Sequence, residues 1–113
     1  MPMNRLAVVA IIVASLIAVT AAQGAVRKVS LTSPVRAGSY ASLTVNVTPK
    51  ARCTIQVIYD TVISKAKGLG PKTGGKITWR WRVGTSTHPG RWPVVVRCGK
   101  SGTLKLKIRV LPR

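Results

Sequence analysis

The sequence predicts one all-β domain, an antiparallel β-sandwich of six or seven strands closed by a single disulfide. Three observations predict this fold class. Apolar and polar residues alternate with a period of two along most of the chain, which is typical of half-buried strands. Turn residues interrupt the alternation at short intervals, and no sustained apolar run has the three- and four-residue spacing of a helix. The chain of 113 residues is long enough for one such domain.

The segment before this domain has the features of a secretory signal peptide. Arg5 is followed by an apolar run at 6–19 and by small residues at 20–25, and a run of 14 residues is shorter than the roughly 20 that span a bilayer. We expect residues 1–22 to be removed, or a cut two residues later, and residues 23–113 to form the domain. The protein is then secreted, extracellular or in the cell envelope. The alternative is an uncleaved membrane anchor.

Six or seven segments are the expected strands, and turn residues interrupt the chain between them. The first clear one begins after Gly38-Ser39 and ends at Pro49, which has no amide hydrogen to donate to a neighbouring strand. Two weaker segments, near 26–31 and 61–64, bring the count to six or seven. The strands with clear alternation are 41–48, 53–57, 77–83, 92–98 and 104–110.

The connections between them contain glycine and proline. Residues 65–75 include four glycines and Pro71, so an irregular and mobile loop is expected, and 84–90 forms a second connection. The tetrapeptide 99–102 predicts a tight hairpin, which makes the last two strands antiparallel neighbours.

Cys53 and Cys98 are the two cysteines, and a secreted protein places them in an oxidising compartment. One pair allows one connectivity. In the chain-entropy model, closing a loop of this length stabilises the fold by about 4 kcal/mol. Two cysteines and the single His88 are too few for a closed zinc site, so no metal or other cofactor is expected.

Acid–base chemistry is nearly absent from the composition. Asp60 is the only acidic residue and His88 the only histidine. One carboxylate cannot form the carboxylate pair of a hydrolytic site, and one histidine with one acid is barely enough for a nucleophile with its base and orienting acid. The sequence therefore predicts a protein that is not an enzyme. Asp60 is expected in a turn or a surface ion pair, and His88, before Pro89, in an exposed turn.

Three tryptophans have the parity of the core positions. Trp79 and Trp81 alternate with Arg80 and Arg82, and Trp92 shares its parity with later valines. We expect all three inside, because a sandwich without phenylalanine needs large apolar side chains. The alternative is a stacking platform for sugar rings or bases.

The charge is the strongest functional feature, with 19 lysines and arginines and a formal net charge of +18. Solubility and the protection of sheet edges would be met by mixed charges with a much smaller net charge. A secreted protein with such a field is attracted to anionic polymers. No nucleic-acid motif is present, so sequence-specific recognition is not expected. The predicted contacts are Lys76, Arg80, Arg82, Arg91, Arg97, Lys105, Lys107 and Arg109.

Two runs resemble a signature of small bacterial secreted immunoglobulin-like (Ig-like) domains: GKITWRWRVG at 75–84 and THPGRWPVVVRC at 87–98. The likeness extends over roughly 33–111. It implies an Ig-like sandwich that serves as an accessory module with no activity of its own. It also implies that Cys53, opening the third strand, and Cys98, ending the sixth, bridge neighbouring strands of one sheet, whereas antibody domains bridge the two sheets. The net positive charge of this chain is far larger than such modules need.

Three functions remain open from the sequence. The first is a non-enzymatic module that binds a teichoic-type polymer, an acidic polysaccharide or extracellular nucleic acid through electrostatics. The second is an Ig-like protein-interaction or structural module of the cell surface. The third is a cationic antimicrobial protein with peripheral membrane contact, against which the lack of a basic amphipathic helix argues.

Overall fold

A computed structural model describes residues 24–113, so the predicted signal peptide lies outside the described residues. The described part is all-β and contains no α-helix. Its only helical turn is a short 3-10 turn, η2, at Gly99–Ser101. The strands are β1 (Ala25–Leu31), β2 (Val35–Arg36), β3 (Tyr40–Tyr59), β4 (Val62–Ile63), β5 (Lys72–Arg82), β6 (Gly90–Arg97) and β7 (Thr103–Leu111).

All seven strands belong to one hydrogen-bonded sheet with β3 at its centre. The strand order is β1-β3-β6-β7-β2, and β4 and β5 also pair with β3. The first half of β3 pairs with β1 and with most of β5, whereas its second half pairs with β4 and β6. The expectation of a purely antiparallel sheet was wrong in one place, because β2 runs parallel to β7. This two-residue strand has no sequence alternation that could have predicted it.

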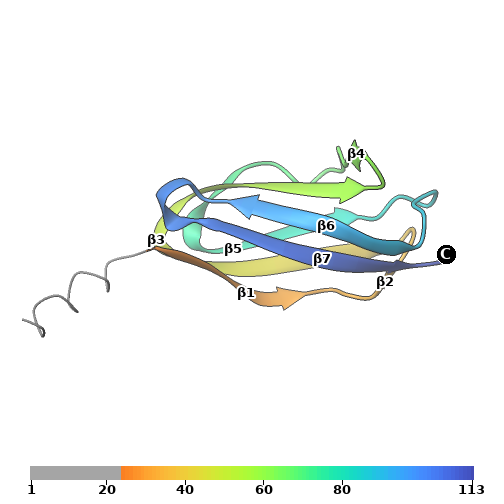
Figure 1. Ribbon diagram of the computed structural model, residues 1–113, viewed down its shortest axis with the longest axis horizontal. Coiled ribbons are helices and arrows are strands. Elements are labelled where there is room, and N and C mark those ends of the chain that lie inside the picture. Colours follow the sequence, from red (N-terminus) through yellow and green to blue (C-terminus); the bar gives the residue numbers. More distant parts are fainter. Residues whose placement is uncertain (1–23) are drawn as a thin grey trace, which may run out of the picture.

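The predicted strands 41–48 and 53–57 form one continuous strand of 20 residues, which corrects the expectation that a strand ends at Pro49. The pairing of β3 with β5 shifts register between Asn46 and Ala51, so Pro49 lies in an irregularity where its missing amide hydrogen breaks no ladder bond. Figure 1 shows that β3 bends sharply here and runs back across the other half of the sheet.

The glycine-rich connection is shorter than predicted. β5 begins at Lys72, so 72–75 are extended and 64–71 form the loop. Lys72, Thr73 and Gly74 pair with the segment of β3 that follows the bend, and this long-range pairing overrides the local turn composition. The predicted 99–102 hairpin is confirmed, with β6 and β7 antiparallel around η2.

The two halves of the sheet share a single hydrophobic core. It is built from alternate positions of β3, β5, β6 and β7 and contains Leu43, Val45, Val94 and Ile108 at 0% exposure. Leu104 and Leu106, which have the same inward parity on β7, are only partly buried against it. Val95 has outward parity but is 8% exposed, because β6 is an inner strand flanked by β3 and β7.

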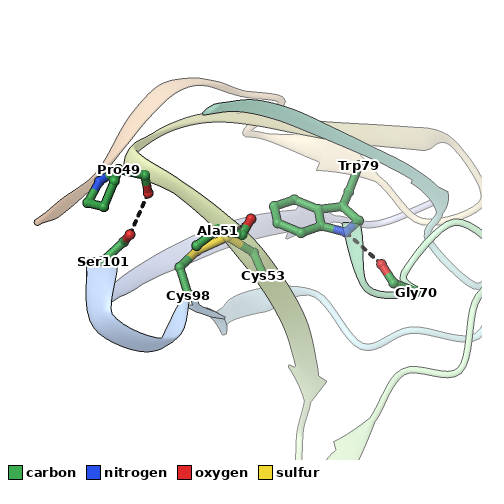
Figure 2. Close-up of a disulfide and its surroundings, with 7 residues drawn as sticks. All are labelled: Pro49, Ala51, Cys53, Gly70, Trp79, Cys98 and Ser101. Atoms are coloured by element: carbon green, nitrogen blue, oxygen red, sulfur yellow. Dashed lines mark hydrogen bonds between the residues drawn. A yellow bond between two sulfur atoms is a disulfide. The ribbon is translucent and has the colours of Figure 1, made fainter. Parts of the chain in front are cut away.

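The disulfide joins Cys53 and Cys98, and both residues are fully buried. Thr54 pairs with Arg97, so the cysteines occupy the next position along the β3–β6 ladder. The Cys98 amide donates to the Gly102 carbonyl on the β7 side, which makes Cys53–Cys98 a non-hydrogen-bonded pair whose Cα atoms are 4.2 Å apart. The bridge therefore crosses neighbouring strands, as expected. Figure 2 shows it beside the bend of β3, where Ser101 Oγ donates to the Pro49 carbonyl at 2.6 Å.

Candidate functional site

The eight cations predicted from the sequence lie on two separate surfaces. One, called here the β6–β7 face, carries five cations, and the other, the β5 face, carries three. Both point away from the shared core, but they belong to different halves of the sheet, so the eight residues do not form one patch. The β6–β7 face comprises Arg91, Arg97, Lys105, Lys107 and Arg109, and the β5 face comprises Lys76, Arg80 and Arg82.

Strand register concentrates positive charge on the β6–β7 face. Arg91 lies directly opposite Arg109, while Lys107 and Lys105 face Pro93 and Val95. The Arg109 amide donates to Ser33 Oγ at 2.9 Å, on the side away from β6. Arg91–Arg109 is therefore a non-hydrogen-bonded pair, the closer of the two antiparallel types. Like charges in direct opposition destabilise a sheet, so a bound anion here would relieve a repulsion.

The β5 face carries fewer cations, but two of them are held in place. The Arg80 guanidinium carbon lies 4.1 Å from the centre of the Tyr40 ring, within the range of a cation–π interaction. Arg82 Nε donates to the Gly38 carbonyl at 2.9 Å. Lys76, further along the strand, is paired in register with Asn46.

Gly38 and Tyr40 were not among the predicted site residues, although Gly38 was expected in the turn before the strand at 41–48. Gly38 has φ +92° in a turn closed by a bond from the Ser39 amide to the Arg36 carbonyl, and a side chain at that φ would be strained. Tyr40 has the parity of the polar positions Ser42 and Thr44, and an aromatic residue on the polar side of a strand was the signal that could have found it.

The one acidic side chain is paired with the one histidine. Asp60 Oδ2 and His88 Nδ1 are 2.8 Å apart on the surface, joining the turn after β3 to the loop before β6. This agrees with an exposed turn for His88 and with a turn position for Asp60. Within residues 24–113 no lysine or arginine has a carboxylate partner.

Trp79 and Trp81 are fully buried, but Trp92 corrects the expectation that all three tryptophans are internal. Trp92 is partly buried against the core, and its indole Nε1 donates to the His88 carbonyl at 2.9 Å. It lies near the start of β6, where a polar ring edge can reach the loop. The alternation of residues along a strand predicts which side each residue faces, but it does not predict how fully a residue near the end of the strand is buried.

Trp81 Nε1 donates to the Tyr59 hydroxyl at 3.1 Å. Burial raises the pKa of Tyr59 above 10.0, and the hydrogen bond from Trp81 opposes this by lowering it. The folded state thus holds the phenolic proton more tightly than the unfolded chain.

This raised pKa predicts a stability loss at alkaline pH. The contribution is constant below the ordinary tyrosine pKa of 10.0 and declines as the pH rises through and beyond it, since the unfolded state loses its proton first. Tyr59→Phe removes the titration but not the ring. We expect the difference in urea midpoint between wild type and Tyr59→Phe to be flat below pH 10 and to move against wild type above it. If the urea midpoints of wild type and Tyr59→Phe keep a constant difference at all pH values, the prediction is contradicted.

In the part of the chain that the structure describes there is no pocket. Residues 24–113 also contain no cluster of three or more metal-ligating side chains. None of the helical segments described is long and apolar enough to cross a membrane. Comparisons with protein-family models, with curated proteins and with solved structures found no match.

Proposed function

We propose that this protein is a non-enzymatic, secreted Ig-like module that binds anionic polymers of the envelope or the extracellular space. The observation that carries the proposal is the unbalanced charge on the outer faces of a β-sheet scaffold. Residues 24–113 hold 18 of the 19 basic residues, and the single Asp60 is paired with His88. The negative charge that balances the lysines and arginines must therefore come from solution. A polyanion supplies this charge, and its binding is favoured because it releases the small cations condensed on the polymer.

The strand arrangement supports the Ig-like part of the proposal. One half of the sheet is β1-β3-β5 and the other is β3-β6-β7-β2, and the two halves enclose one core. Ig-type sandwiches divide their strands in a comparable way. The disulfide agrees with an extracellular location, because such bonds persist in oxidising compartments.

The proposal predicts a steep salt dependence that the β6–β7 face controls in part. Mature protein is expected to bind heparin, duplex DNA and anionic envelope polymer at low salt. Replacing Arg91 and Arg109 by glutamine should reduce the slope of log affinity against log salt by about 2 on duplex DNA, because two phosphate contacts are lost. Isothermal titration at several salt concentrations measures both quantities.

The matched control is Arg91→Lys with Arg109→Lys, which retains both charges and should retain the slope. Failure of the wild-type protein to bind any of the three polymers at low salt would overturn the proposed function. An unchanged slope in the glutamine variant would remove the β6–β7 face from the interaction.

A second candidate, a protein-interaction module, is favoured by one observation. Val62 and Ile63 of β4 are 66% and 48% exposed, and β4 pairs only with the end of β3. Exposed apolar side chains on a short edge strand are a feature of protein contacts. If the protein binds no polymer but Val62→Lys abolishes recovery of a specific surface protein, this second function is the better one.

A further inference from the structure

We infer that Tyr40, Arg80 and Arg82 form a preorganised subsite for a carboxylated sugar, so that the favoured polymer is an acidic polysaccharide. This inference rests on the proposed function and adds to it a location and a ligand class. The two faces differ in how their cations are held, and that difference separates selective recognition from general attraction.

The arginines of this subsite are oriented before any ligand binds. Arg80 lies over the Tyr40 ring, and Arg82 is tied through Nε to the Gly38 carbonyl, which leaves its terminal nitrogens free to donate. Arg80 and Arg82 are two positions apart on one strand, so their stems are about 6.6 to 6.8 Å apart along it. Guanidinium groups held in this way lose little side-chain freedom on binding and match the planar carboxylate with two parallel hydrogen bonds.

The cations of the β6–β7 face are mostly not held in a fixed orientation. Among the described residues, the side chains of Arg91, Lys105, Lys107 and Arg109 have no hydrogen bond or ion pair, and only Arg97 is held, by its bond to Gln56 Oε1 at 3.0 Å. Flexible cations attract any polyanion but discriminate poorly among anion geometries.

The surroundings of the arginine pair favour a sugar over a nucleotide. Arg80 covers one face of the Tyr40 ring, but Tyr40 is still 54% exposed, so the rest of the ring can contact the apolar side of a pyranose. Ser42 lies opposite Arg80, and the adjacent Thr44 and Thr78 hydroxyls are 2.8 Å apart, so hydrogen-bonding groups continue along the face. Single-stranded nucleic acid uses several aromatic rings for successive bases, and Tyr40 is the one exposed aromatic side chain described on this face.

The test separates geometry from charge. Arg80→Lys with Arg82→Lys keeps the net charge but removes the planar donors, and Arg91→Lys with Arg109→Lys makes the same change on the other face. Affinities for polygalacturonate are measured at physiological ionic strength, where screening over about 8 Å suppresses the general field. We expect a loss of about tenfold for the first pair and little change for the second.

Ring and ligand controls complete the experiment. Tyr40→Ala should lose affinity by a similar factor and Tyr40→Phe should retain it, and methyl-esterified polygalacturonate should not bind. Equal effects of the two lysine pairs would overturn the subsite while leaving low-salt polyanion binding intact. Tighter, Arg80- and Arg82-dependent binding of poly(glycerol phosphate) would overturn the sugar assignment in favour of phosphate. No binding of any polymer at low salt would remove the proposed function itself.

Discussion

Replacing Trp79 by alanine is expected to lower the free energy of unfolding by about 3 to 5 kcal/mol. The side chain is fully buried in the shared core, and its Nε1 donates to the Gly70 carbonyl at 2.9 Å (Figure 2). Alanine leaves a large cavity and also releases the 64–71 loop from the strand that it contacts. Since small domains have only about 5 to 15 kcal/mol in total, this loss is a large share of the stability, and the urea midpoint of the variant should fall sharply.

Trp92→Ala is the matched control for this prediction. It removes the same side chain from a site that is only partly buried, so its cost should be clearly smaller. Urea unfolding followed by far-ultraviolet circular dichroism gives both values. If Trp92→Ala costs as much as Trp79→Ala, the two tryptophans do not differ in depth as described.

Removing the disulfide is expected to produce the second large effect. Cys53→Ala with Cys98→Ala should destabilise the domain by about 4 kcal/mol in the chain-entropy model, because the bridge closes a separation of 45 residues. The bridge also ties β3, just after its bend, to the start of η2. The urea midpoint of this variant should fall sharply, and the slope of the transition should rise, because the denatured chain without the cross-link is more expanded.

The oxidation state is checked independently. Thiol titration of the denatured, unreduced protein should find no free thiol, and reduction of the wild type should reproduce the lower midpoint of the double variant. Two free thiols in the secreted protein would contradict the bridge. A double variant as stable as the wild type would mean that the bend of β3 holds without it.

These two features matter more in this protein than in a neutral domain of the same size. A large uncompensated charge destabilises a compact state through self-repulsion. The buried tryptophans and the disulfide act against that repulsion, while the cations stay on the surface. A bound polyanion should also stabilise the fold, because ligands of the native state raise its stability by mass action.

The sequence by itself determined the all-β class, the facing of most residues and the disulfide. A period of two assigns each residue to one side of its strand, and burial of that side places Trp79 and Trp81 in the core. One pair of cysteines leaves no choice of partner. The fold class and the facing of residues depend on neighbours in the chain, so local pattern is sufficient to predict them, whereas the disulfide follows from the count of two cysteines.

Only the tertiary structure decided which outward-facing residues lie together. The two-residue alternation does not predict which strands are neighbours or in what register they pair, since pairing between distant segments sets both. That pairing keeps β3 continuous through Pro49, places Arg91 opposite Arg109 and brings Asp60 to His88. It also divides the predicted cations between two faces and brings Arg80 over the ring of Tyr40, because contacts separated by 40 residues in the chain are specified by the packing of the whole sheet.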